Sequence, residues 1–142
     1  MSLQSIFDIA GSGMSAQSMR LNTTASNLAN AETPSSSEES AYRARYPMFS
    51  TVQAEVNAAM SGTPNLGTGV NVKGVMESNA PVQARYEPAH PLSDEEGYVY
   101  YPNVNVVEEM TNMISASRSF QANVEVMNAT KTMMQRVLTL GQ

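Results

Sequence analysis

The chain has no cysteine and no tryptophan among its 142 residues, and its large apolar side chains are few. Without cysteine it can form neither a disulfide nor a thiolate metal site, and it tolerates either redox compartment. Leu, Ile, Val and Phe make up about 18% of the residues, a little below the roughly 20% at which a compact core becomes hard to build. The net charge of −5 is too small for self-repulsion to keep the chain open. We therefore expect part of the apolar surface to be buried against partners.

Basic residues are also scarce, with eight Lys and Arg against 13 Asp and Glu. They form no stripe that could neutralise phosphates, which argues against binding to nucleic acid or to anionic lipid. No run approaches the ~18 apolar residues of a membrane span, so we expect no lipid-embedded segment. The N-terminus has no basic n-region before Arg20 and no continuous apolar h-region. We expect any export from the cytoplasm to proceed without a cleaved signal peptide.

A heptad pattern predicts one helix over residues 2–30, inside an N-terminal segment 1–31. Its two rows are Phe7, Met14, Leu21 and Leu28, and Leu3, Ala10, Gln17 and Thr24. Ser2 is the predicted N-cap, and Pro34 sets the latest possible stop. Two glycines and many Ser, Thr and Asn residues cost this helix roughly 6 kcal/mol of intrinsic propensity. We expect it to need tertiary or intermolecular packing to be helical.

The C-terminal segment, residues 103–142, carries the clearer pattern. Asn105 followed by Glu108 matches a capping box and predicts a helix from Val106, with Gly141 as a C′ residue. One heptad row is Val106, Met113, Phe120, Met127 and Met134, and the other is Met110, Ser117, Val124, Lys131 and Leu138. The spacing is unbroken over nearly five heptads, which is typical of a coiled coil. The predicted assembly interface along both helices consists of Leu3, Phe7, Met14, Leu21, Leu28, Val106, Met110, Met113, Phe120, Val124, Met127, Met134 and Leu138.

Between the helices the pattern changes twice. Residues 32–41 predict a flexible polar loop, and residues 42–102 predict a small β-rich middle region, because apolar and polar residues alternate at 42–46, 70–72 and 82–86. Pro and Gly divide this region into short pieces that fit a few hairpins. The predicted fold is therefore mainly α with a small β part, in which two long terminal helices pair as a coiled coil and flank a β-hairpin region.

Residues with catalytic or metal-binding chemistry are few. His90 lies near the acidic run 94–96, and one imidazole with carboxylates could hold a divalent cation or perform acid–base chemistry. These residues lie between Pro88 and Gly97, where a solvated turn is favoured. No nucleophile elbow, P-loop or dinucleotide-binding turn occurs. We predict a non-enzymatic protein without catalytic, cofactor-binding or metal-binding residues.

The residues at both ends resemble a known family. Residues 3–33, LQSIFDIAGSGMSAQSMRLNTTASNLANAET, resemble the N-terminal signature of the bacterial flagellar rod, hook and filament-junction family, whose hallmark is ASNLANA at 25–31. Residues 102–141, with SASRSFQAN at 115–123, resemble the proximal rod members of that family still more closely. The resemblance also covers YEP at 86–88 and GYV at 97–99. It departs after Pro34, where relatives have Gly-Tyr and this chain has serines, so the path of that loop cannot be carried over.

The resemblance implies a structural subunit of the basal-body rod, the hollow drive shaft that crosses the periplasm. It implies terminal helices that pair as a coiled coil along the inner wall of the tube, and export of the unfolded chain by the flagellar type III apparatus. The implied partners are other proximal rod proteins, the adaptor between rod and membrane ring, the export apparatus and further copies of the chain. A soluble coiled-coil adaptor that binds a partner helix and a small enzyme that uses His90 are the alternatives.

Overall fold

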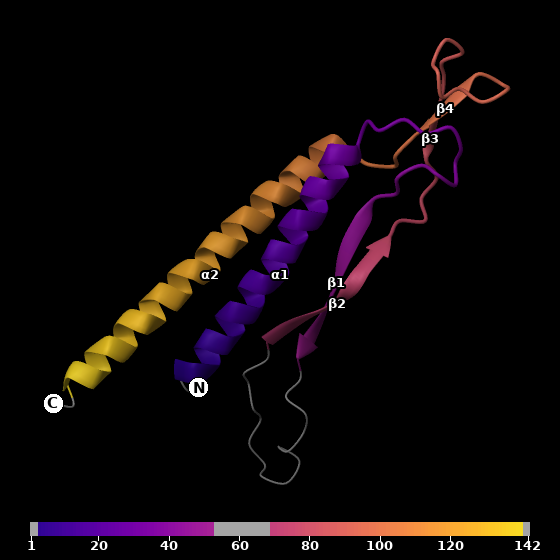
Figure 1. The fold of residues 1–142 in the computed structure, drawn as a ribbon. Helices are drawn as coiled ribbons and strands as arrows, with labels where there is room; N and C mark the ends of the chain where they lie inside the picture. Colours follow the sequence, from indigo (N-terminus) through magenta and orange to yellow (C-terminus); the bar gives the residue numbers. More distant parts are fainter. Residues whose placement is uncertain (1–2, 53–68, 141–142) are drawn as a thin grey trace, which may run out of the picture. The chain divides into compact units, whose positions relative to one another are not determined.

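The chain forms two helices and two small two-stranded sheets in a computed structural model that describes residues 3–52 and 69–140 (Figure 1). In chain order the elements are α1 (Leu3–Asn30), β1 (Arg45–Val52), β2 (Gly69–Glu77), β3 (Gln83–Tyr86), β4 (Tyr98–Tyr101) and α2 (Val106–Leu140). The prediction of a mainly helical fold with a small β part is confirmed. The predicted caps Ser2 and Gly141, and the side chain of Leu3, lie outside the described residues.

The chain divides into two compact units, and each unit contains parts of both helices. One unit comprises residues 1–19, 48–74 and 115–142, and the other comprises residues 20–47 and 75–114. Strands β1 and β2 pair with each other, as do β3 and β4. The buried apolar residues of the described chain are small or medium in size: Ala10, Ala16, Ala41, Ala44, Val99, Val104 and Ala116. This core agrees with the shortage of large apolar residues in the sequence.

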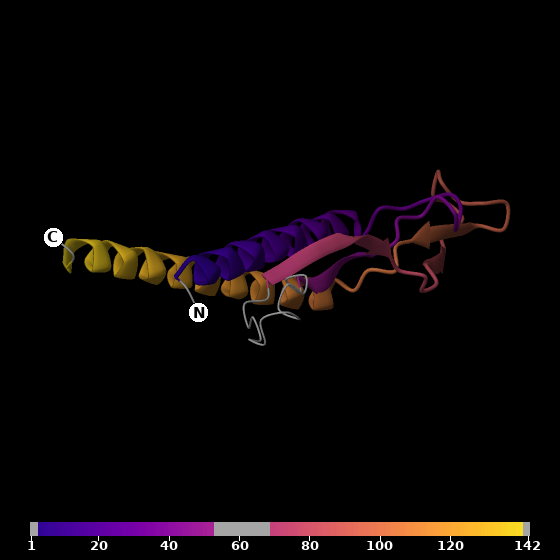
Figure 2. The same cartoon turned by 90° about the horizontal axis from the view of Figure 1, so that it is seen from below.

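In the first unit α1 and α2 pack closely and run antiparallel. Gly11 of α1 faces Met127 of α2, and Gly13, further along α1, faces Asn123, earlier in α2. A Cβ at Gly13 would lie 2.9 Å from Nδ2 of Asn123, so a larger residue would displace that amide. The glycine that weakens α1 in isolation therefore allows the helices to approach each other. Within this unit the last turns of α2 extend beyond the start of α1 (Figures 1 and 2).

Ser12 joins α1 to β2 in the same unit. Its hydroxyl accepts a hydrogen bond from the main-chain N–H of Val70 at 3.1 Å and donates one to the carbonyl of Ile9 at 2.8 Å. A Cβ at Gly69 would lie 2.9 Å from the same hydroxyl oxygen. The start of β2 thus contacts α1 through a small polar side chain.

In the second unit the buried face of the helix pair is largely polar. On α1 the buried residues are Thr23, Thr24 and Asn27, and on α2 Glu109 is buried. The guanidinium of Arg20 donates a hydrogen bond to Oδ1 of Asn112 at 2.9 Å. Polar side chains that find partners in this way fix one arrangement of the two helices, since an unpaired buried group would cost free energy.

Asn27 makes the central connection of the second unit. Its side chain is fully buried, and its Oδ1 accepts hydrogen bonds from the main-chain N–H of Arg45 and from the hydroxyl of Tyr42, each at 2.9 Å. Its Nδ2 donates to the carbonyl of Arg45 at 2.9 Å. The amide therefore pairs with both main-chain groups of one residue, as a neighbouring strand would. This pairing fixes the start of β1 beside the end of α1.

Asn103 secures the residue before β1 in a similar way. Its Oδ1 accepts from the N–H of Ala44 at 2.8 Å, and its Nδ2 donates to the carbonyl of Ala80 at 2.8 Å. The carbonyl of Ala44 accepts from the N–H of Ser78, also at 2.8 Å. Ala44 is fully buried, so all its main-chain hydrogen bonds are made inside the protein.

Strands β3 and β4 form an antiparallel pair with Gln83 opposite Tyr101 and Tyr86 opposite Tyr98. The outer edge of β4 is covered by Ser35, whose N–H and carbonyl both bond to the main chain of Tyr100, at 2.9 and 3.0 Å. The chain after Pro34 therefore turns toward β4, a path that the sequence could not give. The predicted flexibility of residues 32–41 stays a prediction.

The N-terminus of α2 is capped as predicted. Oδ1 of Asn105 accepts hydrogen bonds from the N–H groups of Val107 at 3.1 Å and Glu108 at 3.4 Å. Glu108 and Glu109 stand in the first turn, where acidic residues interact favourably with the helix dipole. This cap fixes the residue at which α2 begins.

Replacing Asn27 with Ala should loosen the second unit, because the N–H and C=O of Arg45 would lose their partners. We expect the free energy that protects the Arg45 amide to fall by about 2–3 kcal/mol. Hydrogen exchange of the full chain measures this loss. Asn30→Ala is the matched control, because within the described part of the chain the Asn30 amide donates to the carbonyl of Ser26 in its own helix and to no strand. Unchanged protection in the Asn27 variant would show that the amide does not hold β1.

Candidate assembly surface

The first turns of α2 present a row of uncovered apolar side chains. Val107, Met110 and Ile114 are 73%, 52% and 55% exposed. Their spacing of three and four residues places them on one face of the helix, opposite the buried Glu109. We call these three residues the outer stripe. Single exposed apolar residues are ordinary, whereas a row on one helix face is typical of a surface that another molecule covers.

A second set of exposed apolar residues lies near the end of α2, in the first unit. This distal patch consists of Val126, Met133, Val137 and Leu138. The turns that carry its last residues lie beyond the start of α1 (Figure 2), so α1 does not cover them. Among the residues that the structure describes, no helix is both long enough and apolar enough to cross a membrane.

The structure places the predicted interface residues at different depths. The half-buried residues are Phe7, Met14, Leu21 and Leu28 on α1, and Val106, Met113, Phe120, Val124, Met127 and Met134 on α2. Met110 and Leu138 are exposed, and the side chain of Leu3 lies outside the described residues. The role of these residues in assembly stays a prediction.

The most deeply buried row of α2 was not predicted from the sequence. Glu109, Ala116 and Thr130 are buried, and Asn123, at the same seven-residue spacing, is half-buried against Gly13. A search for apolar residues misses this row because its members are small or polar. The outer stripe was missed in part for a related reason, since Val107 and Ile114 lie outside both apolar heptad rows. A seven-residue repeat of small and polar residues is the signal that could have revealed the buried face.

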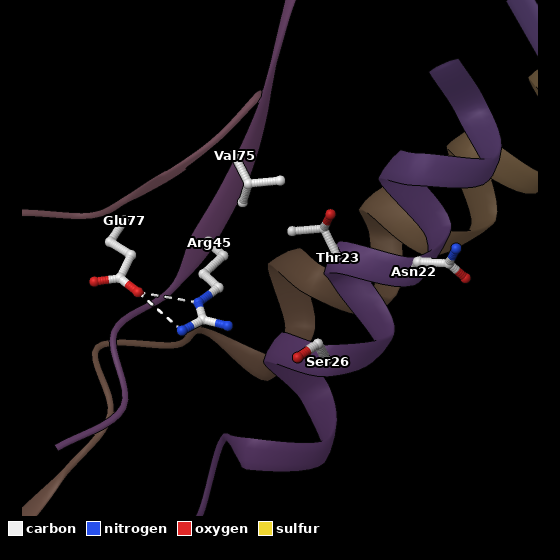
Figure 3. A pocket seen from close by; sticks show the side chains of 6 residues that line it. All are labelled: Asn22, Thr23, Ser26, Arg45, Val75 and Glu77. Atoms are coloured by element: carbon white, nitrogen blue, oxygen red, sulfur yellow. Dashed lines mark hydrogen bonds and ion pairs between the residues drawn. The ribbon is translucent and has the colours of Figure 1, made fainter. Parts of the chain in front are cut away.

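A recess of about 360 Å³ lies in the second unit between α1 and the paired strands (Figure 3). Its lining consists of Asn22, Thr23 and Ser26 from α1, and Arg45, Val75 and Glu77 from β1 and β2. The guanidinium of Arg45 donates two hydrogen bonds to Oε1 of Glu77, at 3.1 and 2.9 Å. The two charges therefore neutralise each other at the wall of the recess. Both side chains are about half exposed, so this ion pair contributes little to stability.

His90 and the acidic run serve a turn. Nδ1 of His90 accepts a hydrogen bond from the N–H of Leu92 at 3.1 Å. Oδ1 of Asp94 accepts from the N–H groups of Tyr98 at 2.8 Å and Glu96 at 3.0 Å, and its Oδ2 accepts from the hydroxyl of Tyr100 at 3.2 Å. Among the described residues, no three His, Cys, Asp or Glu side chains lie close enough to hold a metal ion.

These hydrogen bonds shift two pKa values in opposite directions. The hydrogen bond from the main-chain N–H of Tyr98 is the main cause that lowers the pKa of the Asp94 carboxyl. The same carboxylate accepts a hydrogen bond from the hydroxyl of Tyr100, and this bond raises the pKa of the tyrosine. Both shifts follow from a carboxylate that stays ionised to hold the loop, which is a structural task.

Comparison with known proteins identifies the family to which the chain belongs. Residues 7–34 match the family described as "Flagella basal body rod protein", and residues 95–140 match "Flagellar basal body rod FlgEFG protein C-terminal". Over 143 aligned positions that cover both chains completely, the sequence is 54% identical to the flagellar basal-body rod protein FlgC of Escherichia coli O6:H1. The chain belongs to the FlgC family of flagellar basal-body rod proteins. It is also 52% identical to FlgC of Salmonella typhimurium, with full coverage of both chains, and 36% identical to FlgC of Borreliella burgdorferi, with 100% and 99% coverage.

Membership of the FlgC family confirms the structural function predicted from the sequence. A member of this family is a structural subunit of the flagellar basal-body rod and is located there, and it is not an enzyme. The two family matches cover most of α1 and all of α2, together with β4 and residues 95–97 of the loop before it. The residues that decide the fold, Asn27 and Asn103, and those of the outer stripe all lie within these matches.

The hydrogen bonds of Asp94 predict how the β3–β4 loop responds to acid. Because the pKa of Asp94 is lower in the folded than in the unfolded chain, its stabilising effect is present at neutral pH and is lost as the pH falls through the folded value. We expect the Tyr98 amide signal in NMR spectra of the full chain to change only as the pH falls below the ordinary pKa range of an aspartate carboxyl. In Asp94→Asn this acid transition should be absent, and in Glu95→Gln it should remain. A transition that persists in Asp94→Asn would assign the acid response to another carboxyl group.

Proposed function

We propose that the chain is built into the rod through the outer stripe and the distal patch of α2, which become buried against helices of neighbouring subunits. The observation that carries this proposal is the alignment of Val107, Met110 and Ile114 on one uncovered helix face. An amphipathic helix with anchors at such a spacing is a common partner of another helix. Burying the three side chains would contribute a few kcal/mol per subunit, since a fully buried Val, Ile or Met gains roughly 1.5–3 kcal/mol.

We further propose that α1 and α2 pair as a coiled coil when the rod assembles. Within the first unit the contact of Gly13 with Asn123 supports close antiparallel pairing, and within the second unit the bond from Arg20 to Asn112 supports it. This pairing occupies one face of α2 and leaves the outer stripe available. In a hollow tube, such pairs would line the inner wall while their free faces meet the next subunits.

Export of the unfolded chain by the flagellar type III apparatus is part of the same proposal. The low helix propensity of α1 supports it, as does the small size of the core, since Val99, Asn27 and Pro102 are the largest fully buried side chains among the residues that the structure describes. Such a chain has a low free energy of unfolding, and it gains stability when its exposed apolar surface is buried against neighbouring subunits. The absence of cysteine removes the risk of wrong disulfides in an oxidising compartment.

The proposed partners are other proximal rod proteins, the adaptor between rod and membrane ring, the export apparatus and further copies of this chain. The match of residues 95–140 to a family named for FlgEFG proteins supports the first of these. It indicates that α2 is a segment of a kind that several rod proteins carry, so that helices of different subunits can pack in related ways.

Replacing Ile114 with Asp should block incorporation into the rod. In the free chain the aspartate stays in water, and we expect stability to change by less than about 0.5 kcal/mol. In the rod it would be a buried, unpaired charge, and we expect at least about a tenfold loss of the chain from detergent-extracted basal bodies. Immunoblots of basal bodies and swimming assays measure this loss.

Ser115→Asp is the matched control for Ile114→Asp. It adds the same charge at the next position of α2, where the side chain is also exposed but lies to one side of the outer stripe. We expect it to assemble normally. Normal motility of the Ile114→Asp strain, or equal defects in both strains, would refute the assignment of the outer stripe.

A further inference from the structure

The β3–β4 pair carries two tyrosines on its surface. The rings of Tyr86 and Tyr98 stand edge to face, with their centroids 5.4 Å apart and their planes at 66°. Tyr86 is 66% exposed and Tyr98 is 38% exposed. Most of the Tyr86 ring therefore has no cover within the described part of the second unit, although an aromatic ring is costly to leave in water.

The position of Tyr86 is fixed by the backbone of the following loop. Gly97 has a φ of 84°, in the left-handed region that favours glycine. A Cβ at Gly97 would lie 3.0 Å from Cε2 of Tyr86 and 3.2 Å from Cβ of Pro88, so a larger residue would push the ring or Pro88 away by a few tenths of an ångström. The ring thus rests against the main chain on one side and against Tyr98 on another.

The loop itself is held by hydrogen bonds at both ends. The N–H of Glu87 bonds to the carbonyl of Gly97 at 2.9 Å, and the N–H of Asp94 bonds to the carbonyl of Tyr98 at 2.9 Å. The carboxylate of Asp94 adds the bonds to Tyr98 and Glu96 described above. The exposed ring is therefore preorganised, so that a partner would not have to order it on binding.

The charged residues in the loop beside Tyr86 indicate which kind of partner would bind there. Glu95 and Glu96 are exposed and directly precede Gly97, whereas the nearby base Arg85 stacks on the ring of Tyr101 with its Cζ 4.5 Å from the centroid. Arg45 lies over Tyr42 in the same manner, at 5.4 Å. Among the described residues, an arginine lies over the rings of Tyr42 and Tyr101 but not over that of Tyr86, which lies against Gly97, the residue that follows the two glutamates.

We propose that Tyr86, Tyr98, Glu95 and Glu96 form a docking surface for an arginine of a neighbouring rod subunit. The guanidinium stacks on the open face of Tyr86 and forms ion pairs with Glu95 and Glu96. A rigid aromatic anchor with complementary charge around it is typical of an interface hot spot. This inference rests on the proposed incorporation into the rod, and it names a second contact, separate from the outer stripe.

Three substitutions of Tyr86 test the stacking. Tyr86→Phe keeps the π face and should assemble as the unchanged chain does. Tyr86→Leu keeps apolar volume without a π face, and Tyr86→Ala removes both, so we expect about a fivefold or greater loss of each from basal bodies washed in high salt. Normal retention of the Leu variant would refute arginine stacking, and normal retention of the Ala variant would refute the surface itself.

Charge substitutions and cross-linking give readouts that a merely folding role of Tyr86 would not change. Glu95→Gln with Glu96→Gln should weaken retention about two- to threefold at low salt, with little further effect at high salt, because salt screens the ion pairs. A photoreactive phenylalanine derivative at position 86 should cross-link, in isolated basal bodies, to a peptide of another rod subunit that contains arginine.

The cross-linking experiment separates this inference from the proposed function. If the chain is present in basal bodies but position 86 yields no cross-link, or only one to a peptide without arginine, the docking surface is refuted and the rod assignment stands. If the unsubstituted chain is absent from basal bodies, the proposed incorporation itself fails.

Discussion

The pairing of the Asn27 amide with the main chain of Arg45 is the interaction on which the second unit depends. Through it a side chain near the end of α1 satisfies the main-chain N–H and C=O groups of the first residue of β1, which in most strands bond to a neighbouring strand. Three hydrogen bonds of 2.9 Å meet on this one side chain, and it is fully buried. No other residue type combines this length with a donor and an acceptor on one planar group, so the pairing gives a physical reason for asparagine at this position of the ASNLANA stretch.

Much of the fold could be predicted from local patterns. The heptads predicted both helices, Asn105 marked the start of α2, and alternation at 82–86 predicted a strand close to the observed β3. The connections made by Asn27 and Ser35 could not be predicted, because their partners Arg45 and Tyr100 are distant in sequence. In a polar stretch, the sequence does not distinguish a residue that makes such a contact from one that faces solvent. The buried row of α2 was missed because apolar periodicity does not register Glu109, Ala116 or Thr130.

The candidate assembly surface is related to the shortage of large apolar residues in the sequence. A chain with few large apolar residues places small ones inside, such as Ala44 and Ala116, and keeps Val107, Met110 and Ile114 outside. Sequence periodicity identified Met110 but could not say that it faces outward, since an apolar row fits a partner in the same chain or in another. Only the position of α1 against the opposite face of α2 distinguishes these possibilities.

A rod is loaded in torsion, and the two asparagines bear on how this subunit would carry such a load. The chain has no cysteine and therefore no disulfide. The amide of Asn27 is one of the contacts that would carry a twisting force from α1 to β1, and the amide of Asn103 would carry such a force from the residues before α2 to the strand segments. Asn27 holds Arg45 through two hydrogen bonds to its main chain, and Asn103 joins the main chains of Ala44 and Ala80 with one hydrogen bond to each. Hydrogen bonds of this kind can lengthen or break under load and form again. They would make the subunit elastic at a place where a disulfide would make it stiff.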